Sequence, residues 1–180
     1  MNGLALPEQP GSFEGYASVF GVPDMARDVV MPGAFQQSLA GQRAGSVKLL
    51  WQHDPSQPVG IWSRLGEDSR GLFCQGQLNL DVQRGRELYA LMRQGAINGL
   101  SIGFKTVKAR KDSSGGRQLL AVDLWEISLV TFPLLPLARV SGVKTLVPPS
   151  PALSAPASQV SPASYAQIER ARKIFQSPTR

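Results

Sequence analysis

The sequence predicts an α+β or barrel-like fold: a single β-rich domain with at least two helices. Segments that alternate at the two-residue period of a strand outnumber segments with helical spacing. Strands and helices do not alternate along the chain, so a parallel sheet built from βαβ units is not expected. The chain has 180 residues, 42% of them hydrophobic, which is enough for one core with some chain left over.

The first five predicted segments end at residue 53. In order, we expect a loose N-terminus (1–11), a strand (13–20), a loop (24–30), a short helix (34–39) and a second strand (47–53). Pro32 suits the start of the helix because its fixed φ matches the first helical turn. Asp54-Pro55 is a turn signal, and we expect it to end the second strand.

The remaining predicted elements lie between residues 59 and 132. In order, we expect strands at 59–62 and 71–78, a helix at 82–94, a strand from Gly99, a flexible hairpin-like loop at 112–116 and a strand at 118–132. Asp81 is the expected N-cap of the helix and Gly95 its C-terminal stop. The last strand is apolar on both faces, which favours a central place in the sheet.

Composition changes near Leu146, where prolines become interleaved with serine and alanine, a mixture that cannot supply a core. We therefore divide the chain into a flexible N-terminus (1–11), a folded domain (12–146) and a disordered linker with a basic tail (147–180).

Charge and apolar content exclude several classes of function. The net charge is +6, but the basic residues are spread out and no nucleic-acid-binding motif accompanies them, so no specific nucleic-acid partner is expected. No apolar run approaches the roughly 18 residues of a membrane span, and the N-terminus lacks a signal-peptide pattern. We expect a protein that is neither membrane-bound nor secreted.

The chain has one histidine, His53, and one cysteine, Cys74. One ligand of each kind is too few for a zinc site, so neither a metal nor another cofactor is expected. A base that titrates near neutral pH would have to be His53. Cys74 shares a strand face with leucines and is expected to be a small core residue rather than a nucleophile.

The segment Gly99-Leu100-Ser101-Ile102-Gly103-Phe104 presents a serine between two glycines on one strand face. We expect the Ser101 hydroxyl to be accessible, with bare backbone on either side where a substrate strand could lie. Gly99 to Gly103 also matches the G-x-S-x-G nucleophile elbow, but that motif needs a strand-turn-helix and a later histidine. An α/β-hydrolase is therefore rejected.

Two more polar residues lie in predicted strands. His53 shares its expected face with Val47, Leu49 and Trp51, and Glu126 shares its face with Val122, Leu124 and Val130. A buried carboxylate needs a partner, which His53 or Arg139 could provide. Ser101, His53 and Glu126 are the residue types of a nucleophile, a base and a group that orients the base. A Glu–Arg pair beside a strand-capping histidine and an idle serine is the alternative.

Several short segments occur together in one order. They are Gly15-Tyr16-Ala17-Ser18-Val19-Phe20, Pro32-Gly33-Ala34-Phe35 with Ser38-Leu39, Leu50-Trp51-Gln52-His53-Asp54 with Pro58-Val59-Gly60, Gly71-Leu72, Gly95 with Gly99–Phe104, and Trp125-Glu126-Ile127-Ser128-Leu129-Val130. With them the chain resembles the prohead proteases of tailed bacteriophages and prophages, serine peptidases similar in fold to the herpesvirus assemblins. The resemblance covers roughly Phe13 to Val140.

The resemblance implies a small β-barrel wrapped by helices, with His53 as base and Ser101 as nucleophile. For the third member we choose Glu126, with Asp54 and Asp123 as competitors. The donors for an oxyanion are expected to be backbone N–H groups, from the segment after Phe132 near Arg139.

The resemblance also implies a serine endopeptidase that cleaves scaffold and major capsid protein, and itself, inside the immature procapsid in the host bacterial cytoplasm. Self-cleavage near residues 145–165 that depends on Ser101 would favour the enzyme, whereas a stable full-length chain that co-assembles with capsid protein would favour the alternative below. The oligomeric state is open, with a homodimer among the options. The alternative function is a catalytically inactive scaffold or capsid-assembly partner with the same fold, tethered by its basic tail.

Overall fold

The computed structural model of the chain describes residues 9–40, 45–111 and 115–144. All of them belong to one compact unit, Met1–Leu146. The predicted tail at 147–180, most of the loose N-terminus and the middle of the loop at 112–116 lie outside the described residues. The expectations for these segments stay predictions.

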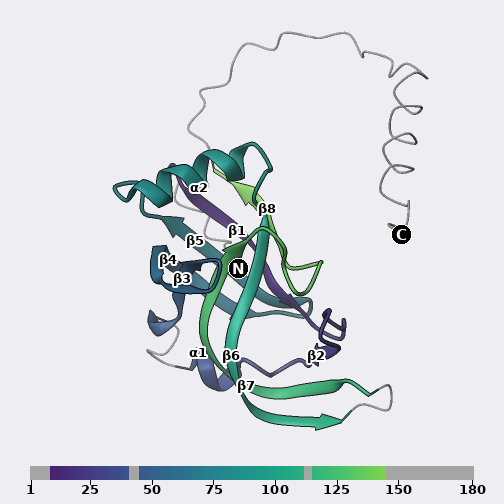
Figure 1. The fold of residues 1–180 in the computed structure, drawn as a ribbon. Coiled ribbons are helices and arrows are strands. Elements are labelled where there is room, and N and C mark those ends of the chain that lie inside the picture. The colour runs from purple at the N-terminus through teal and green to yellow at the C-terminus, as the bar shows by residue number, and fades with distance from the viewer. Residues whose placement is uncertain (1–8, 41–44, 112–114, 145–180) are drawn as a thin grey trace, which may run out of the picture. The chain divides into compact units, whose positions relative to one another are not determined.

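The described residues form eight strands and two helices (Figure 1). They are β1 (Ser12–Val19), β2 (Asp28–Val30), α1 (Gln36–Leu39), β3 (Lys48–Trp51), β4 (Asp54–Glu67), β5 (Gly71–Leu78), α2 (Gln83–Arg93), β6 (Gly99–Lys111), β7 (Arg117–Val130) and β8 (Arg139–Val143). The sheet order β7-β3-β4-β5-β1-β8-β6 closes on itself, because β6 also pairs with β7. The result is a seven-stranded barrel, which confirms the predicted fold class.

The core fills the barrel. Its fully buried side chains come from most of the strands and from both helix regions, and include Phe13, Phe35, Leu49, Leu72, Leu88, Leu100, Leu119, Ile127 and Leu129. In Figure 1, α2 lies at one end of the barrel and α1 near the other, where β6 and β7 extend beyond it as a long hairpin. None of the helices in the described ranges is long and apolar enough to cross a membrane.

Three local predictions were wrong. The expected loop at 24–30 contains β2, which pairs in parallel with β7 and is tied to it by an ion pair between the Arg117 guanidinium and the Asp28 carboxylate. The N-cap of α2 is Val82 rather than Asp81 and makes no side-chain capping bond. Gly95 does follow the helix with a φ of 74°, as predicted.

The third error concerns Asp54-Pro55, which starts the long strand β4 instead of ending its predecessor. Trp51 pairs with Asp54, so the turn falls on Gln52 and His53, whose φ angles are 53° and 59°. A two-residue hairpin loop with positive φ at both positions is a type I′ turn, whose twist suits the flanking strands. The chain therefore reverses two residues earlier than the proline suggested.

A β-bulge in β7 decides which side chains face the core. Gly103 pairs with Glu126 but Phe104 pairs with Leu124, so Trp125 is an extra residue. Leu124 is therefore buried in the core together with Ile127, although the two are three residues apart. The prediction that Glu126 shares its face with Val122 and Leu124 is wrong, because the bulge places them on opposite faces.

Candidate active site

The candidate active site lies on the outer face of the barrel, where β7 runs between β6 and β3. Ser101 of β6 is directly opposite Ser128 of β7, and Gly103 is opposite Glu126. Directly opposite residues of an antiparallel pair share a face, with Cβ atoms about 4.5–5.5 Å apart. Ser101, Ser128 and Glu126 therefore form one cluster on the face opposite the core.

His53 reaches this cluster through the type I′ turn. The Gln52 N–H donates to the Leu129 carbonyl over 3.0 Å, which continues the parallel pairing of β3 with β7. The next N–H, that of His53, donates to Ser128 Oγ over 3.0 Å. The prediction that His53 shares the face of Leu49 and Trp51 is wrong, because the left-handed backbone carries its side chain over the outer face.

Glu126 holds the imidazole. His53 Nδ1 lies 2.6 Å from Glu126 Oε1, and the two side chains are 44% and 12% exposed. The hydrogen bond to Glu126 raises the pKa of His53, the negative charge of the carboxylate raises it further, and partial burial opposes both. The other carboxylate oxygen, Oε2, accepts a hydrogen bond from Ser128 Oγ over 2.7 Å. Nδ1 is thereby engaged, and Nε2 is left for proton transfer.

Arg139, Asp54 and Asp123, the other candidates for pairing with Glu126 or His53, make their hydrogen bonds to other residues. The Arg139 guanidinium donates to Asn98 Oδ1 over 2.6 Å and to the Pro136 carbonyl over 2.9 Å. The Asp54 carboxylate accepts the N–H and the hydroxyl of Ser56. Asp123 accepts the indole N–H of Trp125 over 2.9 Å. In the described part of the chain, Glu126 is thus the carboxylate that contacts His53.

The glycines beside Ser101 do not leave the open face that the sequence suggested. An added Cβ on Gly103 would overlap Glu126 Oε1, and one on Gly99 would lie 2.9 Å from Pro133 Cδ. Ser101 is only 9% exposed as a result. The two glycines accommodate the Glu126 carboxylate and the turn after β7, and the expectation of bare backbone for a substrate strand is wrong.

The segment after Phe132, the expected source of oxyanion donors, is hydrogen-bonded to the start of β6. The Leu100 N–H donates to the Ala138 carbonyl over 3.0 Å, and the Val140 N–H donates to the Asn98 carbonyl over 2.8 Å. These two N–H groups are already engaged and are not free to serve as oxyanion donors. The identity of the donors stays a prediction.

Sequence reasoning missed Ser128, which makes hydrogen bonds to both His53 and Glu126. The available signal was its place two residues after Glu126, on the same strand face. Cys74 is fully buried, and burial raises the pKa of its thiol to about 12, as suits a core residue. No cluster of three or more metal-ligating side chains occurs among the described residues.

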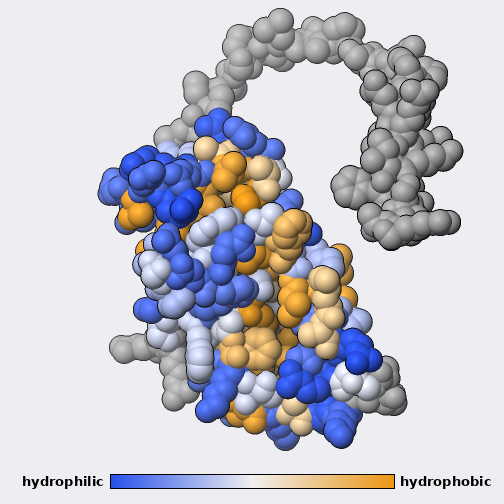
Figure 2. All heavy atoms as spheres, viewed as in Figure 1, coloured by the Kyte–Doolittle hydropathy of each residue, from blue (hydrophilic) through white to orange (hydrophobic). Residues whose placement is uncertain are grey.

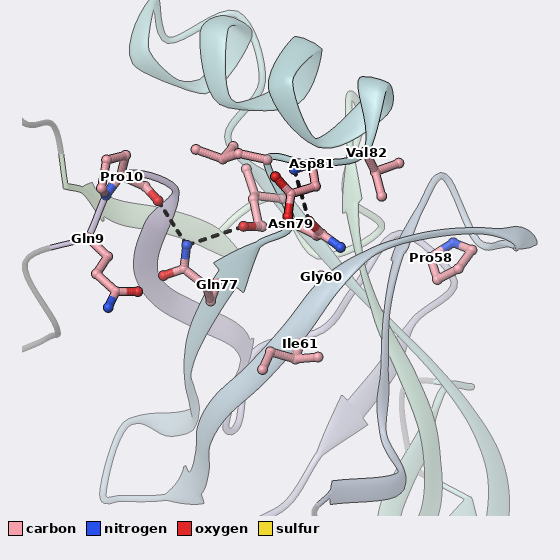
Figure 3. Close-up of a pocket in the computed structure, with 11 residues that line it drawn as sticks. Gln9, Pro10, Pro58, Gly60, Ile61, Gln77, Asn79, Asp81 and Val82 are labelled. Carbon is pink, nitrogen blue, oxygen red and sulfur yellow. Dashed lines mark hydrogen bonds between the residues drawn. The ribbon is translucent and has the colours of Figure 1, made fainter.

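One pocket in the described residues lies away from this cluster. It has a volume of about 630 Å³ and is bounded by β4, β5 and the start of α2 (Figure 3). Gly60, Ile61, Gln77 and Val82 contribute to its wall, but His53, Ser101 and Glu126 do not. Ser101 instead lines a smaller pocket of about 40 Å³ together with Ala17 and Ile102. Figure 2 shows apolar side chains gathered near the middle of the visible face, between hydrophilic ones over α2 and the β6–β7 hairpin.

Comparison with known proteins gives consistent results. The chain is 38% identical over 141 residues to the prohead protease of Enterobacteria phage HK97, a match that covers 76% of this chain and 61% of that protein. It is 28% identical over 149 residues to the capsid polyprotein of Pseudomonas phage PAJU2, covering 79% of this chain and 21% of the polyprotein. The chain thus spans less than two thirds of either relative.

Among solved structures, the bacteriophage T4 capsid assembly protease gp21 has a similar fold. Its TM-score is 0.57 at 16% identity, over 72% of this chain and 89% of that chain. The family model for the caudovirus prohead serine proteases matches residues 5–148, which include every described residue. The chain belongs to the caudovirus prohead serine protease family.

Proposed function

We propose that this protein is a serine endopeptidase that cleaves scaffold and major capsid protein, and itself, during procapsid maturation in the host bacterial cytoplasm. The observation that carries the proposal is the His53–Glu126 pair over β7, on the same face as Ser101. A serine hydroxyl is a weak nucleophile until a neighbouring base takes its proton. The cluster supplies that base and a carboxylate to orient it.

In the proposed mechanism, Ser101 Oγ attacks the carbonyl carbon of the scissile peptide bond while His53 Nε2 takes its proton. His53 then returns the proton to the leaving amine, and the acyl group stays on Ser101. A water molecule, deprotonated by His53, releases the acyl group as a carboxylic acid. Glu126 keeps the imidazole in the required tautomer and stabilises the imidazolium that forms in each step.

The substrates are proposed from the relatives. The names of those relatives connect them with proheads and capsids. Because the chain spans only part of each, the activity of the whole relative reaches this chain as a proposal. Self-cleavage near residues 145–165 would support the protease, and the oligomeric state stays open, with a homodimer among the options.

The test is co-expression with a cognate capsid protein and scaffold, with intact masses measured for every product. Ser101→Ala should abolish cleavage, since removal of the nucleophile costs roughly 10⁴-fold or more. Ser18→Ala is the matched control, because Ser18 is also a buried strand serine but its hydroxyl has no hydrogen-bond partner among the described residues. Wild-type protein that co-assembles uncut, or Ser101→Ala protein that still cleaves, would overturn the proposal and favour an assembly partner.

A further inference from the structure

Ser128 is fully buried, and its single hydroxyl makes hydrogen bonds to two residues of the candidate site. It lies on β7 between Ser101 of β6 and Leu50 of β3, both directly opposite it in register. Its Oγ donates to Glu126 Oε2 over 2.7 Å and accepts the backbone N–H of His53 over 3.0 Å. The same atom therefore touches the residue that carries the base and the carboxylate that orients it.

We propose that Ser128 is a positioning residue that fixes the His53 backbone and the Glu126 carboxylate relative to each other. The inference rests on the proposed function, since it assigns Ser128 a part in the same site. Glu126 is held at both oxygens, by His53 on Oε1 and by Ser128 on Oε2. A carboxylate held only at Oε1 could rotate about its terminal bond and draw the imidazole away from Ser101.

The backbone at His53 shows why an acceptor is needed there. Gln52 and His53 both have positive φ, a region of backbone conformation that non-glycine residues seldom adopt. Such a conformation persists only where neighbouring contacts determine it. The Gln52 N–H is held by a backbone carbonyl of β7, whereas the His53 N–H is held by the Ser128 side chain.

The charged groups around His53 come from three elements. β7 supplies Glu126, and β3 supplies Lys48, which is exposed and in register with Glu126. Asp54 of β4 adjoins His53, but its carboxylate is turned to Ser56. The opposite residues of β6, Ser101 and Gly103, carry no charge. Loosening Glu126 should therefore lower the pKa of His53 towards its ordinary value of 6.5.

The experiment exploits the fact that His53 is the only histidine in the chain. Its imidazole gives one set of C–H signals in an NMR spectrum, so its pKa can be followed with no substrate present. We would titrate the full-length wild type with Ser128→Ala, Ser128→Thr and Ser38→Ala, and measure peptide cleavage against pH for each. Ser38 is the matched control, because its buried hydroxyl also makes two hydrogen bonds to β7, to the Val122 carbonyl and from the Leu124 N–H.

We expect Ser128→Ala to lower the pKa of His53 and to reduce kcat on the order of 10- to 100-fold with little change in KM. Ser128→Thr keeps the hydroxyl and should restore both. Ser38→Ala should lose stability but leave the pKa and the acid limb of the pH profile unchanged. If Ser128→Ala fails to fold, Ser128→Cys replaces it, since a thiol has a similar shape but is a weak donor.

The positioning role would be overturned if Ser128→Ala kept the wild-type pKa of His53 and the wild-type kcat. It would also be overturned if Ser38→Ala lowered the pKa of His53 by as much as Ser128→Ala does. A fall in the pKa of His53 in Ser128→Ala without cleavage by the wild type would uphold the positioning role and sink the proposed protease function. The two proposals can therefore fail separately.

Discussion

Gly103 offers a direct way to separate the carboxylate from the base. In β6 it lies opposite Glu126, and an ideal Cβ there would overlap Oε1 and lie 2.8 Å from Cδ and 2.9 Å from Cγ of that side chain. No backbone atom is among these nearest neighbours. Gly103→Ala therefore asks the far end of a flexible side chain to move and leaves the barrel in place.

The size of that movement follows from the distances. Ordinary contact with a Cβ begins near 3.4 Å, so Glu126 Cδ must retreat by about 0.6 Å and the overlapping Oε1 by more. The present distance from Oε1 to His53 Nδ1 is 2.6 Å. Lengthening it by that amount or more takes it to the limit of hydrogen bonding, about 3.2 Å, or beyond. Misplacement of about 1 Å in a catalytic constellation costs on the order of 10²-fold in rate.

The assay is cleavage of a capsid peptide together with the NMR titration of His53 and a thermal melt. We expect Gly103→Ala to melt close to the wild type, to cut roughly 10²-fold more slowly and to have a lower pKa at His53. Gly66→Ala is the neutral control, because nothing lies within 4 Å of its added Cβ. Wild-type cleavage and an unchanged pKa in Gly103→Ala would refute the claim that Glu126 orients His53.

The remaining predictions concern the third catalytic group and the thiol. Glu126→Gln should reduce cleavage by about 10⁴-fold. Because Glu126 raises the pKa of His53, and only the deprotonated imidazole acts as base, the acid limb of the variant's rate profile should shift to lower pH. Asp54→Asn and Asp123→Asn should stay within a fewfold of the wild type, and a large loss in either would reassign the third member. Iodoacetamide should leave the buried Cys74 unmodified in the native protein and label it in guanidinium chloride; rapid native labelling would contradict its place in the core.

Most of the strands could be predicted from the sequence because period-two alternation is a local property, whereas the small barrel was implied by the family resemblance. The strand at 71–78, the helix at 82–94 and its stop at Gly95 match the structure to within a residue or two. β2 could not be predicted, because three residues gain a strand conformation only from pairing with β7 and from the Asp28–Arg117 ion pair. Both of those contacts join segments far apart in the sequence.

The three proposed catalytic residues could be chosen from the sequence, but their arrangement could not. His53 was placed on a strand, whereas it lies in a turn whose positive φ no local pattern marks for a Gln-His pair. Glu126 was placed among core residues, because strict alternation hides a bulge. Ser128 looked like an ordinary strand serine, since its hydrogen bonds depend on both of those irregularities.

Because of the bulge at Trp125, β7 contributes side chains both to the core and to the candidate active site. With unbroken alternation, Glu126 would share a face with Leu124, so the strand would bury the carboxylate in the barrel or expose its leucine. Burying an unpaired carboxylate costs several kcal/mol, and exposing the leucine gives up about 1.5–3 kcal/mol. The extra residue avoids both costs, because Leu124 stays in the core and Glu126 lies under His53. The position of the bulge, one residue before Glu126, therefore lets β7 contribute side chains to the core and to the proposed catalytic cluster.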